Sequence, residues 1–479
     1  MKKKILIANR GEIAIRIIRA VQELGNTAVA IYETPDSEAL HIRIANEAVW
    51  IGDGPRSDYL SIEKVIKAAK EHDVDAIHPG YGFLAENPDF AKACEEAGII
   101  FIGPSSEVIH NLGNKVIARQ IMADAGIPMV PGTQNLSPGK DGENEALEFC
   151  AQYGYPVMLK ATAGGGGRGI REVHSDAQLK EEYPQARSEA KAAFNDDSVY
   201  LEKMVINPKH VEVQVMADAE GTTIHLGTRD CSIQRRHQKL VEIAPSMIPD
   251  KALLDQICET AVKAAKASNY FNAGTVEFLV DKDKFYFMEI NTRVQVEHTV
   301  TEMVTGIDIV RTQIKLAFGK KLSFSQDDIQ IRGHAIEMRI NAEDPQNNFM
   351  PEGGKTVTTY RSPGGYGVRL DGFVYQGFTI PEVYDSLLVK LTVHGYSWNE
   401  TVDRLRRCLR NYIITGPKTT IPFYLNLVED PDFQKGDFDT SFLETHKHLF
   451  EYKEDISEGS KLASLIAEIH HKELNPYAS

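Results

Sequence analysis

The first hundred residues alternate between short apolar segments and amphipathic segments, and this alternation restricts the possible folds more than any other feature of the chain. Apolar strands are expected at residues 4–8, 28–32, 75–78 and 99–102. A helix is expected over residues 11–24, where apolar side chains recur at helical spacing. Strands that alternate with helices predict a parallel sheet with helices on both faces. The turn at residues 9–12 lacks the GxGxxG spacing, so no dinucleotide site is expected there.

The length of the chain requires more than one domain. It has 479 residues, whereas a single hydrophobic core stops growing at about 250–300 residues. A turn-rich joint at residues 126–132 precedes a second α/β region, and short strands with glycine turns follow residues 327–334. A charged segment begins after residue 440 and predicts a terminal helix over 457–476. The fold class is therefore a combination of α/β and α+β parts.

Composition and charge exclude several classes of function. The formal net charge is −15, which argues against a general nucleic-acid-binding protein because such a protein needs a basic face. No apolar run approaches the roughly 18 residues of a membrane span, and the run at residues 5–8 is too short for a signal peptide. The five cysteines form no CxxC pair, which is typical of reduced thiols. We therefore expect a cytoplasmic protein without membrane or nucleic-acid partners.

A run of four glycines predicts a phosphate-binding loop. It lies between Lys160 and Arg168, directly after an apolar strand at residues 156–159. Glycines without a Cβ let backbone N–H groups close around phosphate oxygens, and the absence of a GKS/T ending excludes a Walker A loop. The alternative is a flexible linker, which rarely has flanking cations held by regular structure. A weaker signal is the strand at 199–205, whose Glu202-Lys203 pair could border a purine pocket or simply lie on an exposed sheet edge.

Five cationic or potentially cationic side chains fall within residues 229–239 of this acidic protein. Such runs are usually solvated surface, but strand-like segments at 224–226 and 241–244 enclose this one. We interpret it as a positive lining for an anionic substrate. Cys231, inside the run, is interpreted as a packing residue and not as a nucleophile.

Two strands, at residues 275–280 and 284–291, form the strongest signal for chemistry. An Asp-Lys-Asp turn joins them, and a hairpin centred near Asp283 places Glu277 directly opposite Glu289. Opposed like charges are destabilising unless a cation lies between them, and carboxylate oxygens suit Mg²⁺ or Mn²⁺. Asn291, on the same strand face, can add a carbonyl oxygen. The alternative is a pair of glutamates on a solvated strand face.

Polar residues continue to alternate with apolar ones as far as residue 297. If the extended geometry persists, Arg293, Gln295 and Glu297 project into the same site as Asn291. Arg293 can clamp a planar oxyanion such as bicarbonate through two parallel hydrogen bonds. Glu297 would then be a general base within reach of that anion.

These motifs, together with residues 8–14, 78–84 and 339–344, resemble biotin carboxylase over about residues 2–445. The resemblance implies an ATP-grasp fold with a doubly wound parallel N-terminal α/β domain, a mobile lid and a β-rich C-terminal domain. The implied parts are 1–113 (N-terminal domain), 114–318 (ATP-grasp domain, with the lid at about 131–204), 332–446 (C-terminal domain) and 447–479 (helical tail).

The resemblance also implies the reaction and its residues. Biotin is carboxylated with ATP and bicarbonate through carboxyphosphate, giving ADP and phosphate. Nucleotide contacts are assigned to Lys115, Lys160, Gly166, Gly167, Glu202, Lys203, Met204, Val205, His210, Gln234, His237, Glu277, Leu279 and Glu289. Two Mg²⁺ or Mn²⁺ sites are assigned to Glu277, Glu289 and Asn291. Bicarbonate and biotin contacts are assigned to Tyr81, Lys239, Arg293, Gln295, Val296 and Arg339. The catalytic residues would be Lys239, Arg293, Glu297 as the base, and Arg339 facing the biotin enolate.

The chain contains neither the Met-Lys-Met setting in which this family carries biotin nor a carboxyltransferase segment. We therefore expect a homodimeric protein that works on a separate biotin carboxyl carrier protein and beside a carboxyltransferase subunit. The final acceptor could be acetyl-CoA, pyruvate or 2-oxoglutarate, and the segment beyond Leu443 resembles that of the biotin carboxylase subunit in two-subunit pyruvate carboxylases. The alternatives are another ATP-grasp ligase of the carbamoyl-phosphate type and a non-catalytic nucleotide-binding subunit.

Overall fold

The structure is a computed structural model that describes residues 2–55, 57–163, 169–236 and 238–452. Three of the predicted features therefore lie outside the described residues: the nucleotide contacts Gly166 and Gly167, the contact His237, and the terminal helix expected at 457–476. Among the helices that are described, none is long and apolar enough to cross a membrane.

The N-terminal part is a five-stranded parallel sheet in the order β3-β2-β1-β4-β5, as predicted from the alternation. Its strands are β1 (Lys4–Ile7), β2 (Thr27–Glu33), β3 (Glu47–Gly52), β4 (Ala76–His78) and β5 (Ile100–Phe101). Its helices are α1 (Gly11–Glu23), α2 (Leu40–Ile44), α3 (Ile62–Glu71), α4 (Pro88–Glu96) and α5 (Ser106–Gly113). Strand β3 was not expected, because it is an edge strand whose Ala48 and Trp50 are exposed, which hides its apolar pattern.

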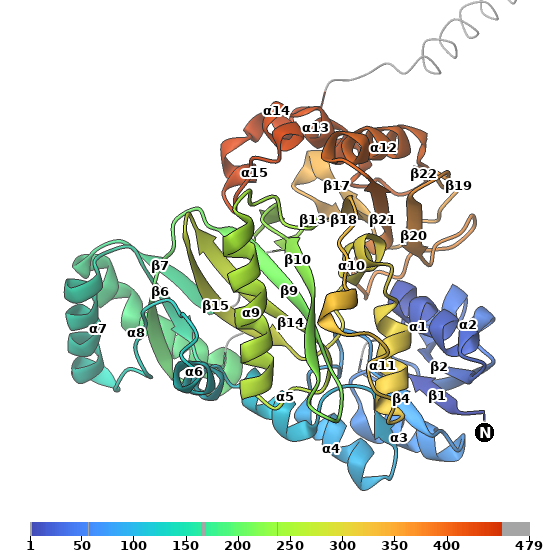
Figure 1. The fold of residues 1–479 in the computed structure, drawn as a ribbon, viewed down its shortest axis with the longest axis horizontal. Helices are drawn as coiled ribbons and strands as arrows, with labels where there is room; N and C mark the ends of the chain where they lie inside the picture. Colours follow the sequence, from blue (N-terminus) through green and yellow to red (C-terminus); the bar gives the residue numbers. More distant parts are fainter. Residues whose placement is uncertain (1, 56, 164–168, 237, 453–479) are drawn as a thin grey trace, which may run out of the picture.

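An eight-stranded antiparallel sheet forms the centre of the molecule, in the order β15-β14-β9-β10-β13-β16-β21-β20. Its strands are β9 (Lys209–Ala217), β10 (Thr223–Asp230), β13 (Val241–Ala244), β14 (Asn272–Asp281), β15 (Lys284–Asn291), β16 (His334–Asn341), β20 (Val368–Gly372) and β21 (Leu387–Gly395). Helix α9 (Lys251–Ala267) lies across β15, β14, β9 and β10 on one face (Figure 1). The sheet continues from the expected ATP-grasp region into the expected C-terminal region, because β13 pairs with β16.

A small subdomain projects beyond this sheet, at the left of Figure 1. It contains the sheet β7-β6-β8, made of β6 (Val157–Ala161), β7 (Ile170–Val173) and β8 (Val199–Lys203). Helices α7 (Gly139–Tyr153) and α8 (Asp176–Phe194) pack on it and share its own hydrophobic core, which includes Leu159, Leu179 and Leu201. Helix α6 (Lys115–Asp124) connects the subdomain to the N-terminal part.

Most of the remaining elements lie around the C-terminal half of the central sheet, whereas η1 follows β2 and α11 packs on α1 and β14. The helices are α10 (His298–Thr305), α11 (Ile309–Ala317), α12 (Trp398–Asn411), α13 (Ile421–Glu429), α14 (Pro431–Lys435) and α15 (Phe442–Thr445), with the short 3-10 helices η1 (Thr34–Asp36), η2 (Gln326–Asp328), η3 (Pro345–Asn347) and η4 (Lys447–Phe450). The short strands are β11 (Gln234–Arg235), β12 (Gln238–Lys239), β17 (Glu343–Asp344), β18 (Met350–Pro351), β19 (Thr359–Arg361) and β22 (Ile413–Thr415). Helix α12 covers one face of this region, where it packs on β21 and β16.

Candidate active site

One face of the central sheet is charged although it is buried. Along β9, Val211, Val213 and Val215 point into the core beneath α9, so the alternate residues must point to the opposite face. These alternate residues include Glu212 and His210, which are buried at 0% and 6% relative exposure. Buried charges are costly unless they are paired, so this face of the sheet is the candidate active site.

The predicted opposition of Glu277 and Glu289 is confirmed, and a β-bulge produces it. At the turn, Asp281 pairs with Lys284, a register that would bring Glu277 opposite Met288 if it continued unbroken. The register shifts between Glu277 and Phe278, and Glu277 then pairs with Glu289. A bulge thus re-aims one carboxylate toward the other, as bulges beside functional sites commonly do.

The carboxylate of Glu277 is surrounded by donors. His210 Nε2 lies 2.7 Å from one oxygen, while Lys239 Nζ (3.0 Å), Asn291 Nδ2 (2.7 Å) and Gln295 Nε2 (2.9 Å) all reach the other oxygen. Burial would raise the pKa of Glu277, but Lys239 and His210 hold it well below its ordinary value. Glu277 is therefore ionised at the centre of the site.

Lys239 links three carboxylates. Its Nζ atom contacts Glu212 and lies 3.0 Å from oxygens of both Glu277 and Glu297. Burial opposes the charge, yet these carboxylates raise the pKa of Lys239 well above its ordinary value. Lys239 is thus a permanent cation among fixed anions, which is a preorganised position for stabilising an anionic substrate.

The extended geometry expected beyond Asn291 is not found. Strand β15 ends at Asn291, and the chain bends before Glu297 becomes the residue that precedes α10. The polar side chains converge nevertheless, since Arg293 donates to Asn291 Oδ1 (3.2 Å) and to Gln295 Oε1 (3.1 Å). The bend, and not alternation along a strand, brings these groups together.

Glu297 lies between two cations, Lys239 of the short strand β12 and Arg339 of β16 in the central sheet. It is fully buried and contacts Lys239 (3.0 Å) and Arg339 Nη2 (3.2 Å). Burial would raise the pKa of Glu297, but Lys239 and then Arg339 lower it below its ordinary value despite repulsion from Glu212. Arg339 is in turn held by Glu242, whose oxygen accepts from Arg339 Nε at 2.7 Å.

Several residues of this network were missed by the sequence reasoning. Glu242 is a lone acid in the apolar strand β13, and that pattern could have marked it as inward-facing. Glu86, which accepts from Arg293 Nε at 2.9 Å, lies in a loop that carries no periodic signal. Lys390, fully buried on β21, donates to the Val296 carbonyl at 2.8 Å and pairs with Glu12. Only the fold brings these segments together.

The cationic run at 229–239 does not act as a single positive lining. Arg229 is fully buried and donates to Glu212, Gln214, Thr275 and Thr301. The side chain of Arg235 reaches the Asn348 carbonyl and lies over the Phe349 ring instead. Only Lys239 among the described cations of the run meets the Glu277 and Glu297 carboxylates, so the interpretation holds for that residue alone. Cys231 is buried, consistent with a packing residue.

The residues expected to contact nucleotide form a second cluster, between the small subdomain and α6. Lys160 on β6 and Arg119 on α6 both pair with Glu202 of β8. Lys115 is the first residue of α6, and its burial lowers its pKa although Glu289 opposes this. Lys203, by contrast, turns its Nζ toward the carbonyls of Gly154 and Pro156, both at 3.2 Å.

The remaining expected contacts are divided between the two clusters. Gln234 donates to His210 (2.7 Å), and Leu279 pairs with His210 across β14 and β9. Met204 and Val205 follow β8 directly and are partly buried. Tyr81 donates to Glu12, beside Lys390, and so lies next to the Arg339 end of the site.

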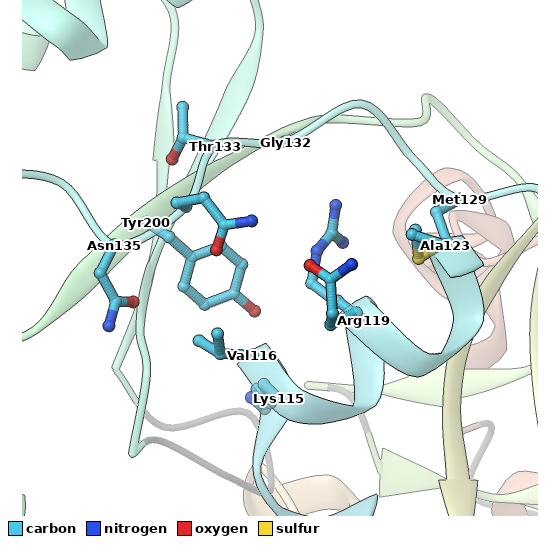
Figure 2. A pocket seen from close by; sticks show the side chains of 11 residues that line it. Lys115, Val116, Arg119, Ala123, Met129, Gly132, Thr133, Asn135 and Tyr200 are labelled. Atoms are coloured by element: carbon cyan, nitrogen blue, oxygen red, sulfur yellow. The ribbon is translucent and has the colours of Figure 1, made fainter. Parts of the chain in front are cut away.

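A cavity of about 190 Å³ opens beside the second cluster. Figure 2 shows Tyr200, Thr133 and Asn135 facing Lys115 and Arg119 across it. Among the described residues expected to contact nucleotide, Lys115 alone lines this cavity, and the Glu277 and Glu297 carboxylates are not part of its lining. The cavity therefore borders the expected nucleotide site, but the carboxylates expected to take part in the reaction do not line it.

The acidic pair fits a divalent cation. Glu289 is exposed and has no hydrogen bond or ion pair with any residue that the structure describes, although it faces Glu277. Asn291 adds an amide next to the pair. An oxygen-only donor set of this kind suits Mg²⁺, which is bound through one or two carboxylates plus nucleotide phosphates.

The buried charges of the sheet predict a dependence of stability on pH. Burial raises the pKa of Glu337 to about 8 from an ordinary value of 4.5; Lys390 opposes the shift and Glu242 adds to it. The folded protein thus holds a proton that the unfolded chain loses, so this group destabilises the fold progressively as pH rises from about 4.5 to 8. Glu337→Gln should flatten the fall in melting temperature over that window. An identical pH profile in the variant would contradict the assignment.

The antiparallel sheet with its charged face, together with a small subdomain that carries Lys160 on β6, defines an ATP-grasp enzyme. A family model for the ATP-binding domain of the carbamoyl-phosphate synthase L chain matches residues 114–325. Models for the N-terminal and C-terminal domains of biotin carboxylase match residues 1–109 and 337–445.

Whole-chain relatives narrow this class to one family. Biotin carboxylase 1 of Bacillus subtilis is 50% identical, covering 93% of this chain and 99% of that protein. Pyruvate carboxylase of the same organism is 51% identical over 98% of this chain, which spans 41% of that protein. The biotin carboxylase domain dimer of Hydrogenobacter thermophilus 2-oxoglutarate carboxylase, solved with MgADP, ADP and bicarbonate, matches with a TM-score of 0.90 and 49% identity over 95% of this chain and 100% of that one. The chain therefore belongs to the biotin carboxylase family of ATP-dependent ligases.

Proposed function

We propose that the charged face of the central sheet carries out both halves of biotin carboxylation. A bicarbonate oxygen attacks the γ-phosphate of ATP, which forms carboxyphosphate and releases ADP. Carboxyphosphate then breaks into CO₂ and phosphate. The phosphate takes the proton from the ureido nitrogen of biotin, and that nitrogen attacks the CO₂. The observation that carries the proposal is the position of Glu297, which bridges Lys239 on one side and Arg339 on the other.

Lys239 and Arg293 are proposed to hold bicarbonate. The reaction brings two anions together, and their repulsion must be offset by cations fixed beforehand. Lys239 meets this need because three carboxylates keep it charged. Arg293 is anchored through Nε to Glu86, while its remaining nitrogens face Asn291 and Gln295. Gln295 and the backbone of Val296 complete the proposed bicarbonate site.

Glu297 is proposed as the base that removes the bicarbonate proton. It is held ionised, which is the form that can accept a proton, and it touches the cation proposed to bind the substrate. Arg339 and Tyr81 are proposed to contact biotin, with Arg339 stabilising the enolate form of the ureido group. Glu242 would position Arg339 for this task.

Glu277, Glu289 and Asn291 are proposed to hold Mg²⁺ or Mn²⁺, with two ions in the complete site. Such cations neutralise charge on transferred phosphate groups. Lys115, Lys160 and the glycine loop are proposed to hold the phosphates. Glu202, Lys203, Met204, Val205, His210, Gln234, His237 and Leu279 would surround the adenosine.

The partners follow from the family and are also proposals. Biotin would arrive on a carrier protein and leave for the carboxyltransferase. Homodimer formation is proposed because the H. thermophilus relative is a domain dimer. The cytoplasmic location is proposed because the five cysteines are free and buried. The preference for pyruvate over acetyl-CoA stays a prediction, since the acceptor reacts at the carboxyltransferase and not at this site.

One assay separates the proposed reaction from its alternatives. ATP hydrolysis should depend on bicarbonate and rise further with free biotin. Turnover driven by ammonia or glutamine would instead indicate a carbamoyl-phosphate-type ligase. No hydrolysis under any of these conditions, from protein that binds ADP, would indicate a non-catalytic nucleotide-binding protein.

Replacing Arg339 should separate the two halves of the reaction. Arg339→Gln is expected to lower biotin carboxylation more than bicarbonate-dependent ATP hydrolysis, because the guanidinium is proposed to act on biotin. Both rates can be measured in one coupled assay by following ADP and carboxybiotin. Equal losses in the two rates would contradict a role confined to biotin.

A further inference from the structure

Two histidines and two aspartates lie close together at the C-terminal end of the described chain, apart from the charged face of the central sheet. Asp430 and Asp432 lie at the start of α14, while His446 and His448 flank the start of η4. These elements lie at the top of the molecule in Figure 1, beside α13. The four side chains share no contact with Lys239 or Glu297 among the contacts of the described residues.

The ligand atoms of this cluster already lie at close range. His446 Nε2 is 3.2 Å from Asp432 Oδ2, and His448 Nε2 is 2.8 Å from Asp430 Oδ2. One ligand atom each from Asp430, Asp432 and His446 lie within 4.8 Å of one another. A tetrahedral zinc site with bonds of about 2.1 Å separates its ligand atoms by roughly 3.4 Å. Small side-chain rotations would therefore bring Asp430, Asp432 and His446 to coordinating positions, and His448 would join them through its place beside Asp430.

The hydrogen bonds of His446 point to a cation. Its Nδ1 atom lies 2.8 Å from the Phe442 carbonyl, and a carbonyl can only accept, so Nδ1 carries the proton. In the neutral ring, Nε2 then directs a lone pair at the Asp432 carboxylate, and two acceptors face each other. Metal-binding histidines are typically held in this way, with the second ring nitrogen donating to a backbone carbonyl. The ring is further fixed by stacking on Phe442, with centroids 4.0 Å apart.

The second ligand pair, Asp430 and His448, is also positioned by hydrogen bonds. Asp430 is the N-cap of α14, where its Oδ1 accepts from the backbone N–H groups of Asp432 (2.9 Å) and Phe433 (3.0 Å). Its other oxygen is thereby directed at His448. The Asp430 side chain is 2% exposed and that of His448 is 58% exposed, so the site is fixed from within and open to solvent.

We propose that Asp430, Asp432, His446 and His448 bind a divalent transition metal, with Zn²⁺ as the best-matched ion. Imidazole nitrogen with carboxylate oxygen suits Zn²⁺, whereas Mg²⁺ and Ca²⁺ prefer oxygen alone. The ion would connect the start of α14 to η4 and so fix these two elements to each other. The site is structural and does not depend on the proposed catalytic roles.

The test is a Zn²⁺ titration of the full, chelator-stripped protein that compares wild type with variants, because His210, Glu212 and Glu277 form another group that could hold a metal ion. Wild type should bind one Zn²⁺ through this cluster, and the double variant His446→Gln/His448→Gln should bind it on the order of 100-fold more weakly. His72→Gln is the matched control, because His72 also pairs with a carboxylate, Glu47, at 3.3 Å. It should bind Zn²⁺ as wild type does.

Two further measurements test whether the cluster coordinates the ion directly. Asp432→Asn alters one half-exposed ligand, so it should fold normally and still weaken Zn²⁺ binding. Co²⁺ substituted for Zn²⁺ should give the intense visible absorption of tetrahedral coordination in wild type and not in the double variant. Zn²⁺ binding of equal strength in wild type and the double variant would overturn the proposal. A wild-type protein that binds no Zn²⁺ would also overturn the proposal, because the cluster would then consist of two His–Asp ion pairs.

Discussion

Replacing Glu297 with glutamine is expected to slow biotin carboxylation by about 10²–10⁴-fold, the usual effect of losing a general base. Glutamine keeps the size of the side chain and can still accept from Lys239 or Arg339, but it cannot take a proton from bicarbonate. The rate of carboxybiotin formation at saturating ATP and bicarbonate measures the effect directly.

The binding of ADP provides the control for this variant. Glu297 lies among Lys239 and Arg339 and is not one of the residues proposed to contact nucleotide. ADP affinity, measured by calorimetry, should therefore be close to that of wild type. Carboxylation at a near-wild-type rate would refute the assignment of Glu297 as the base.

Arg229→Met should produce the largest loss of stability, about 3–5 kcal/mol in the free energy of unfolding. Arg229 is 0% exposed and pairs with Glu212, which is also 0% exposed. Removing one partner of a buried pair leaves a buried charge with less compensation, which costs far more than the pair contributes. The unfolding transition in urea, compared between variant and wild type, measures the loss.

Two companion variants separate this cause from a general loss of packing. Arg229→Met/Glu212→Gln removes both charges, and it should recover part of the lost stability. Arg410→Met breaks an exposed ion pair with Glu429, where the arginine side chain is 64% exposed, and should cost less than about 1 kcal/mol. If the double variant is no more stable than Arg229→Met, the uncompensated charge is not the cause.

The parallel N-terminal sheet and the Glu277–Glu289 hairpin could be predicted because both depend on local patterns. Alternating strand and helix segments predict a parallel sheet, and a short turn between two apolar runs predicts a hairpin. The opposition of Glu277 and Glu289 depends in addition on the bulge between Glu277 and Phe278, which the turn does not predict. The edge strand β3 escaped prediction because exposed positions interrupt its apolar pattern. The bend after Asn291 was not predicted for a different reason. Polar and apolar residues continue to alternate beyond Asn291, although strand β15 ends there.

The sequence predicted many of the charged groups that meet at the site and the family to which the chain belongs, since both depend on short motifs in a fixed order. Folding decided which charges meet. The pairing of β13 with β16 extends one sheet across both halves of the chain, and this brings Arg339 to Glu297 and Glu242. The fold also gives different surroundings to two cations of one run. Arg229 is fixed within the sheet by Glu212, whereas Lys239 contacts Glu297 in the site. Such partners are distant in sequence, and only strand pairing and burial determine which of them come within contact distance.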